Sequence, residues 1–300
     1  MRHPNQMRAA IAALAVIALA ALGLAGSASA KLTGNYAKFA QCPYTNLEVK
    51  KCLYAVTEGG EVVLGNKKVP IEKPAVLQGG YGKPDEVTGL SPFFAATNGV
   101  TLSKAPQNVP GGLAGLVNCK EITNFILKTS CEWTFENGIT GVTSTLELAR
   151  PASEIRISEK HLAEEIGVAM ELPVKVHLEN PFLGSSCYVG SSSSPMIWKL
   201  TTGETNPPAG TAPIRGFGGT AEFLEEGRIV VTRGTKLVDN AWAAPGATGC
   251  GGFLVELLLD PIVNASSGLP SAAGKNVAIL ENTINVASRA AVNKNNEENP

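Results

Sequence analysis

The chain is poor in the side chains from which metal sites and catalytic centres are most often built. Histidine occurs three times, and aspartate occurs only at Asp85, Asp239 and Asp260, which are far apart. Scattered aspartates do not make the acidic loop of a calcium site. No C-x-x-C pair is present for a zinc ribbon or a thioredoxin-like redox site. We therefore expect no metal ion and no cofactor.

Charge excess and long apolar runs are also lacking after residue 30. The net charge is −1, and it falls to −3 when Arg2 and Arg8 are removed. A nearly neutral chain offers no basic patch for nucleic acid or anionic lipid. The apolar segment 253–263 is too short to span a bilayer and contains Glu256 and Asp260. We expect no nucleic-acid partner, and no membrane anchor once the leader described next is removed.

Residues 1–30 have the pattern of an export signal. Arg2 and Arg8 precede an Ala-rich apolar run, and Ala-Ser-Ala at 28–30 forms a small-residue cleavage site. The run approaches membrane-spanning length, but it ends in small residues rather than a charged flank, which favours cleavage after Ala30. Ser27 stands where a bacterial lipoprotein would have cysteine. The sequence thus predicts a secreted protein, either extracellular or associated with the cell wall.

Six cysteines follow the predicted signal, and an even number in an exported chain indicates disulfides. Fifteen pairings are conceivable for six cysteines. We favour neighbours along the chain, which closes two short loops and one long loop, each worth roughly 3–4 kcal/mol in the chain-entropy model. The favoured structural pairs are Cys42–Cys52, Cys119–Cys131 and Cys187–Cys250.

The segment 184–188, Gly-Ser-Ser-Cys-Tyr, resembles a G-x-S-x-G nucleophile elbow whose last glycine is replaced by tyrosine. A disulfide offers another reason for its small residues, because the two Cα atoms must approach closely. Both Cys187 and Cys250 are surrounded by Gly, Ser and Ala. We therefore predict that Ser185 and Ser186 are packing and turn residues rather than nucleophiles.

Alternation of apolar and polar residues is the main secondary-structure signal. It is clearest over 170–179, where a period of two predicts a strand with one buried face and one solvent-exposed face. This pattern places His177 on the solvent-exposed face. Pro173 on that face indicates an edge strand or a bulge. Gly59-Gly60 and Gly65-Asn66 are predicted as the turns of a three-strand meander. The unalternating segment 251–263 is predicted as one buried helix.

Short strands separated by Gly, Pro and Ser, without a βαβ rhythm, predict a mainly β protein. We expect an antiparallel β-sandwich or barrel-like domain with one or two short helices. This disulfide-braced domain covers residues 31–288, and the sequence allows a sub-boundary near 106–112. Residues 289–300 are expected to form a disordered polar tail.

Catalytic candidates are few, because only His161 and His177 remain after the signal. Any Ser-His-Asp arrangement must use one of them. His161 lies near Glu164 and Glu165 in the densest ionisable cluster of the chain, and on a helix His161 and Glu165 would share a face. This cluster is the candidate site of the alternative function, a hydrolase, but a solvated charged turn is the favoured explanation.

Several stretches resemble a group of uncharacterised secreted proteins from actinobacteria. They are "VPIEKPAVLQGG", "GITGVTSTLELARPASEI", "LPVKVHLENPFLGSSCYVGSSSSP", "APGATGCGGF" and "GLPSAAGKNVAIL". The resemblance covers most of the chain after residue 30. It implies an exported actinobacterial protein, and it implies no activity, cofactor or site.

The function favoured by the sequence is a non-enzymatic, disulfide-braced β protein with a structural or binding role in the cell envelope. Its partner would be a cell-wall polymer, another surface protein or a small ligand. The alternative is a secreted hydrolase built around His161, Glu164 and Glu165. A third class is a module that scavenges a metal or another ligand.

Overall fold

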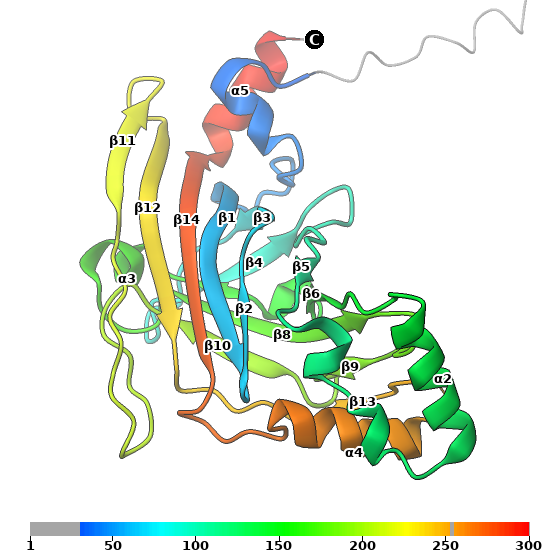
Figure 1. The fold of residues 1–300 in the computed structure, drawn as a ribbon. Coiled ribbons are helices and arrows are strands. Elements are labelled where there is room, and N and C mark those ends of the chain that lie inside the picture. The colour runs from blue at the N-terminus through cyan, green and yellow to red at the C-terminus, as the bar shows by residue number, and fades with distance from the viewer. Residues whose placement is uncertain (1–30, 253–254, 300) are drawn as a thin grey trace, which may run out of the picture.

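The computed structural model describes residues 31–252 and 255–299, so the predicted export signal lies outside the described residues. Fourteen strands are connected into one antiparallel sheet that is folded into two layers (Figure 1). The two end strands of this sheet, β11 and β5, do not pair with each other, so the sheet is not a closed barrel. The prediction of a mainly β, antiparallel fold is confirmed.

The first layer, called sheet A, consists of long strands that stand upright in Figure 1. In spatial order they are β11 (Thr220–Leu224), β12 (Ile229–Asp239), β14 (Val277–Ser288), β1 (Lys51–Leu64) and β3 (Ala75–Tyr81), with β2 (Lys67–Pro70) beside the end of β1. Strand β4 (Ser91–Ala95) pairs with β3 and with β7, so it connects the two layers.

The second layer, sheet B, is centred on β8, and its strands run across those of sheet A (Figure 1). Strand β8 pairs with four different neighbours, which makes it the most central strand of the fold. The strands are β5 (Gln107–Asn108), β6 (Thr143–Leu148), β7 (Arg156–Ile157), β8 (Met170–Glu179), β9 (Tyr188–Val189), β10 (Met196–Leu200) and β13 (Ala247–Thr248).

Short helices lie at the two ends of the molecule. Helices α2 (Phe125–Glu136) and α4 (Glu256–Ser267) lie at the lower end in Figure 1, and α5 (Arg289–Glu298) lies at the upper end. Helix α3 (Glu159–Glu164) lies between these ends. The 3-10 turns are η1 (Gly34–Phe39), η2 (Gly112–Gly115), η3 (Cys119–Glu121) and η4 (Ala152–Glu154).

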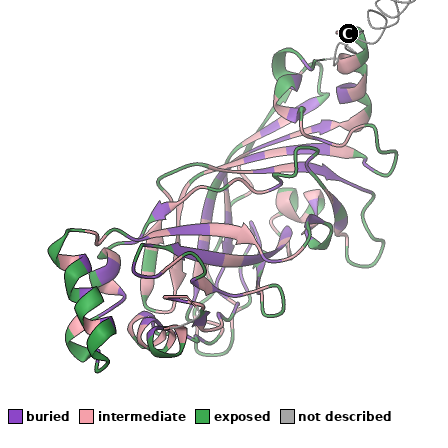
Figure 2. Cartoon of the chain, turned by 90° about the vertical axis from the view of Figure 1, so that its right-hand side faces the viewer, coloured by how far each residue is buried: buried purple, intermediate pink, exposed green. Residues whose placement is uncertain are grey.

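Two hydrophobic cores result from this arrangement, and Figure 2 shows that most buried residues lie in the strands. The larger core fills the space between the sheets. The smaller core packs η1 and α5 on the upper end of sheet A, where the Cys42–Cys52 disulfide joins the segment after η1 to β1. The fold is therefore a two-layer domain with a second, minor core at one end.

The C-terminal segment contributes to that smaller core. Residues 289–300 were expected to be disordered, but residues 289–298 form α5, whose Ala291 and Val292 are buried. Ser288 caps the helix by accepting a hydrogen bond from the Ala291 amide. The helix is therefore held by two small apolar residues in the minor core and by hydrogen bonds to the N-terminal segment, such as that from the Tyr44 hydroxyl to Asn296 Oδ1.

Sheet A bends sharply where two strands each contain an extra residue. Strand β1 bulges between Thr57 and Gly59, and β12 bulges between Thr232 and Thr235. Both bulges face Asn282 of β14. The prediction of a turn at Gly59-Gly60 is therefore wrong, because β1 continues through both glycines as one bent strand. The predicted turn at Gly65-Asn66 is confirmed, since it joins β1 to β2.

The central position of β8 corrects the expectation for Pro173. This proline pairs with Ile197 of β10 on one side. On the other side its carbonyl accepts a hydrogen bond from Ala149, just where β6 ends. The missing N–H of proline therefore falls at the gap between β6 and β7 rather than at an outer edge of the sheet.

Gly60 is required at the bend, and its substitution tests this. Its φ is 104°, and a Cβ atom there would lie 2.1 Å from the Ile279 carbonyl oxygen. We expect Gly60→Ala to lower the free energy of unfolding by about 2 kcal/mol or more, measured by urea denaturation. Gly141→Ala is the control, because a Cβ atom at Gly141 meets nothing within 4 Å. Equal stability of the two variants would contradict this role of Gly60.

Candidate functional site

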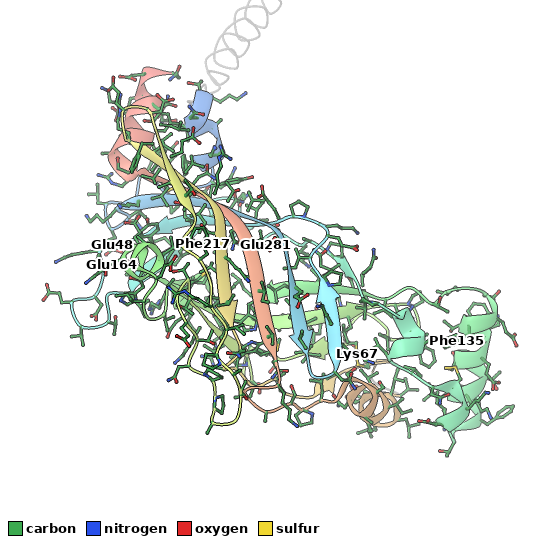
Figure 3. All side chains as sticks on the ribbon, turned by 60° about the vertical axis from the view of Figure 1, so that its left-hand side comes forward. Glu48, Lys67, Phe135, Glu164, Phe217 and Glu281 are labelled. Atoms are coloured by element: carbon green, nitrogen blue, oxygen red, sulfur yellow. A yellow bond between two sulfur atoms is a disulfide. The ribbon has the colours of Figure 1, made fainter. Side chains whose placement is uncertain are left out.

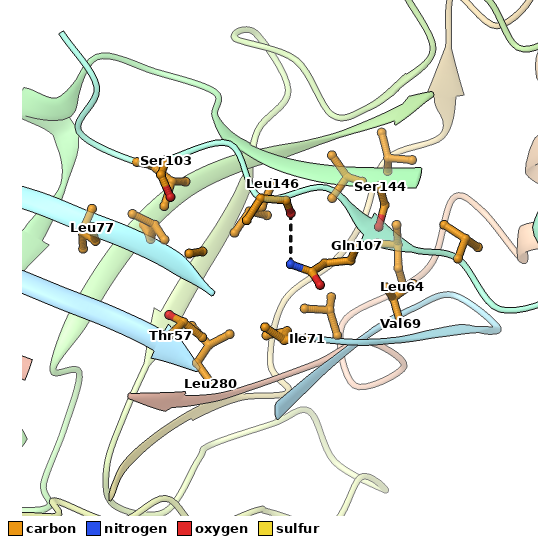
Figure 4. A pocket seen from close by; sticks show the side chains of 18 of the residues that line it. Thr57, Leu64, Val69, Ile71, Leu77, Ser103, Gln107, Ser144, Leu146 and Leu280 are labelled. Atoms are coloured by element: carbon orange, nitrogen blue, oxygen red, sulfur yellow. Dashed lines mark hydrogen bonds between the residues drawn. The ribbon is translucent and has the colours of Figure 1, made fainter. Parts of the chain in front are cut away.

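A cavity of about 120 Å³ lies between sheets A and B (Figure 4). Sheet A contributes Ala55 and Leu77 to its wall, and sheet B contributes Leu146 and Val176. Most of its other lining side chains are also apolar. Well-packed protein interiors rarely leave spaces larger than a water molecule, so a cavity of this size is a notable feature of the fold.

The cavity is long and narrow rather than round. Its lining follows β1 from Ala55 to Leu64, a path of roughly 30 Å at about 3.3 Å per residue. A volume of about 120 Å³ along such a lining corresponds to a small mean cross-section. The bulge of β1 between Thr57 and Gly59 lies within this same stretch of the strand.

The polar groups that line the cavity are mostly paired within the protein. Thr57 Oγ1 donates a hydrogen bond to Asn282 Oδ1 at 2.8 Å, and Asn282 Nδ2 donates to the Leu280 carbonyl at 2.9 Å. Ser103 Oγ accepts a hydrogen bond from the Val76 amide at 2.8 Å. These bonds use most of the donors and acceptors of the three side chains, so the middle of the cavity is largely apolar.

Gln107 holds one wall of the cavity in place. Its Oε1 accepts hydrogen bonds from the Glu72 and Lys73 amides at 2.8 and 2.9 Å. Its Nε2 donates to the carbonyls of Lys73 and Ala105 at 2.7 and 3.0 Å, and the bond to Ala105 is drawn in Figure 4. The segment 106–112, where the sequence allowed a boundary, thus ties the β2–β3 connection to β5.

The turn between β1 and β2 ends the cavity on the last turn of α4. The Asn66 amide donates to the Ser267 carbonyl at 2.9 Å, and Asn66 Nδ2 donates to the Ser266 carbonyl at 3.0 Å. Lys67 follows directly, lines the cavity, and is half-buried. Ser267 also lines the cavity, is 3% exposed, and its Oγ has no hydrogen-bond partner among the described residues.

The structure does not bring the predicted ionisable cluster together. His161 Nδ1 lies 2.8 Å from the Val168 carbonyl oxygen. Glu165 ends α3 in the left-handed region and binds Arg215 and the Gly218 amide, both through its carboxylate. Glu164 faces Lys160 at 4.0 Å. Each of the three side chains has a different partner, so they do not form a shared catalytic geometry.

His177 is buried rather than solvated, which corrects the sequence prediction. It is 9% exposed, because Tyr188 of β9 pairs opposite it and stacks on its ring at a centroid distance of 4.3 Å. His177 Nε2 lies 3.1 Å from the Ser185 carbonyl oxygen. The alternating pattern placed His177 correctly on the outer face of β8, but a single sequence does not reveal that β9 pairs with β8 and places the Tyr188 ring against His177.

Glu147 of β6 lies next to His177, in a hollow of about 310 Å³. Although partial burial acts to raise it, the Lys104 and Lys175 ammonium groups hold the pKa of Glu147 below its ordinary value. Their Nζ atoms lie 3.1 and 3.4 Å from the carboxylate oxygens. Glu147 is thus a paired anion, which is unsuited to act as a general acid.

The Gly-Ser-Ser-Cys-Tyr loop has the structural role that the sequence favours. The structure contains the disulfides Cys42–Cys52, Cys119–Cys131 and Cys187–Cys250. Ser186 Oγ donates to the Gly249 carbonyl at 2.8 Å, and a Cβ atom at Gly249 would lie 2.4 Å from the Ser186 carbonyl oxygen. The backbones therefore approach too closely for any residue but glycine at position 249.

No group of three or more His, Cys, Asp or Glu side chains within the described residues is placed to hold a metal ion. Trp198 and Trp242 contact each other at a centroid distance of 5.6 Å, but both are buried in the larger core. The sequence predicted that the helix in the segment 251–263 would be buried. Helix α4 is only partly buried, and its Leu257 is 86% exposed. The apolar cavity is therefore the best-defined candidate site among the described residues.

Sequence reasoning missed this cavity. Its wall combines alternate residues of several strands that lie far apart in the chain, and each strand alone has the pattern of an ordinary buried face. One local signal was present, since Thr57 and Asn282 are polar residues at alternate positions that are otherwise apolar in their strands. Polar residues at such positions mark a bend or a cavity only after the strands are paired.

The unpaired hydroxyl of Ser267 gives a testable prediction. Burial without a partner costs free energy, so Ser267→Ala is expected to leave the free energy of unfolding unchanged or to raise it by about 1 kcal/mol. The control is Ser271→Ala, since Ser271 Oγ donates to Asn276 Oδ1. That variant is expected to lose about 1–2 kcal/mol in the same urea denaturation measurement. Similar losses in both variants would show that Ser267 Oγ has a partner in solution.

No family model, no curated protein and no solved structure matches this chain. The resemblance to exported actinobacterial proteins therefore stays a prediction. Function has to be argued from the geometry of the cavity and from the chemistry of the groups that line it.

Proposed function

We propose that this protein is an exported, non-enzymatic binding protein that takes an apolar ligand into the cavity between sheets A and B. The observation that carries the proposal is the cavity itself. A concave, largely preformed, mostly apolar cavity with a few polar groups is the usual form of a small-molecule site. Burial of each methylene group of a ligand there would contribute about 0.8 kcal/mol.

The chemistry of the lining supports binding rather than catalysis. Thr57, Gln107 and Asn282 are engaged with one another or with the backbone, so they are not available as nucleophile or base. Lys67 is the one ionisable side chain among the described residues that line the cavity. A general acid–base pair requires two suitably placed groups, and this cavity does not supply them.

The same lining favours an apolar ligand over the other partners considered from the sequence. A cell-wall polysaccharide presents many hydroxyl groups, which would need a polar groove with free donors and acceptors. Another surface protein would need an extended contact area rather than an internal space. The cavity offers neither, so a small apolar ligand fits it best.

Export is supported by the disulfides. Three disulfides are typical of proteins that fold in an oxidising environment outside the cytoplasm. Among the described residues, no helix is long and apolar enough to cross a membrane. The proposed location is therefore the extracellular space or the cell wall.

A filled cavity tests the proposal. Ala55 lines the cavity and is 6% exposed, so Ala55→Phe places a ring in the space that a ligand would use. We expect wild type to bind a fluorescent fatty-acid probe, and Ala55→Phe to weaken binding at least about tenfold, equivalent to about 1.4 kcal/mol. Equilibrium fluorescence titration measures both affinities.

The matched control is Val56→Phe, because Val56 is the next residue on β1 and points to the opposite face of sheet A. It should bind the probe as wild type does. Absence of probe binding to wild type, or equal affinity of wild type and folded Ala55→Phe, would refute ligand binding in this cavity.

A further inference from the structure

We propose that the ligand is a single linear hydrocarbon chain with an anionic end group, bound with its tail along the cavity and its end group beside Lys67. This inference rests on the proposed function and specifies its ligand class. It follows from three features of the described residues: the shape of the cavity, the orientation of Lys67, and the unpaired hydroxyl of Ser267.

The shape selects a chain over a compact ring system. The cavity follows β1 over roughly 30 Å, while its volume is only about 120 Å³. A sterol or another fused-ring molecule needs width, which would require the two sheets to separate. A polymethylene chain needs length and little width, and its contacts are with apolar side chains such as Leu77, Leu146 and Leu280, all labelled in Figure 4.

Two adjacent lysines in β2 differ in a way that indicates the position of the charged end. Lys68 is exposed and pairs with Glu61. Lys67 lines the cavity at the end of the β1–β2 turn, next to α4 (Figure 3). No carboxylate of the described residues lies within ion-pair distance of Lys67. A lysine that lines an apolar cavity at its end and has no carboxylate partner is suited to receive an anion there.

Ser267 supplies a second polar group at the same end. It is 3% exposed, and its Oγ lacks a partner among the described residues. A buried donor without a partner costs free energy, and a ligand oxygen would relieve this cost. Its backbone accepts a hydrogen bond from Asn66, the residue before Lys67, so the hydroxyl and the ammonium belong to one end of the cavity.

The end of α4 does not prevent an anion from binding. A helix C-terminus carries partial negative charge on its free carbonyl groups, which would repel an anion. Here the Ser266 and Ser267 carbonyls accept hydrogen bonds from Asn66, and the Asn264 carbonyl accepts one from the Leu269 amide. Because these carbonyls are occupied, the unpaired charge at this end is that of Lys67.

The test compares ligands that share one tail and differ only in the end group. Dodecanoate, dodecyl phosphate and dodecanol are titrated into the full mature chain by calorimetry, below their micelle concentrations. The variants are Lys67→Met and, as matched control, Lys68→Met. Unfolding curves of both variants verify that they are folded.

We expect wild type to bind at least one of the two anionic ligands about tenfold or more tightly than dodecanol, as a charge-assisted contact would provide. Lys67→Met should lose this preference and keep its affinity for dodecanol, whereas Lys68→Met should behave as wild type. The tighter of the two anionic ligands identifies the end group as carboxylate or phosphate.

Equal affinity for the anionic ligands and dodecanol would overturn the proposed end group and leave apolar binding intact. So would an equal loss of preference in Lys67→Met and Lys68→Met. If no ligand binds wild type, the proposed function itself fails, so the two failures are distinguishable.

Discussion

The bend of sheet A at Asn282 determines most of what this protein can do. The two strands that flank β14, β1 and β12, each contain an extra residue next to their pairing position with Asn282, and the Asn282 amide bonds to Thr57 and to the Leu280 carbonyl. Bulges increase local twist and bend a strand away from its course. Sheet A therefore curves over sheet B instead of packing flat against it, and the narrow apolar space between them follows from that curvature.

The curvature of sheet A also explains why the lining of the cavity is largely apolar in its middle and polar at one end. Thr57 and Asn282, which lie at the bend, are hydrogen-bonded to each other and to the backbone. They line the cavity, but these bonds already occupy their polar atoms. At the opposite end of β1, the chain has to turn against α4, and there Lys67 and Ser267 enter the lining with their polar atoms unengaged. The residues proposed to recognise an amphiphilic ligand are therefore different from the residues that form the bend of the sheet.

The sequence predicted features that depend on local chemistry. The strand over 170–179 and the turn at Gly65-Asn66 are recognisable because periodicity and glycine conformation act over a few residues. The same glycine signal at Gly59-Gly60 was misread as a turn, since a bulge and a turn need the same positive φ, and only the pairing with β14 decides between them. Two features, the burial of His177 and the presence of the cavity, depend on which strands pair with each other. The sequence of a single strand does not contain this information.

The four hydrogen bonds of Gln107 have a further consequence for how the cavity could open. They join the β2–β3 connection to β5 through an amide, which neither gains nor loses a proton over the ordinary pH range. A change of pH or ionic strength therefore has little effect on the strength of these four hydrogen bonds. If the cavity binds a ligand as proposed, opening of this wall would require these hydrogen bonds to break, and temperature rather than salt or pH would control its rate.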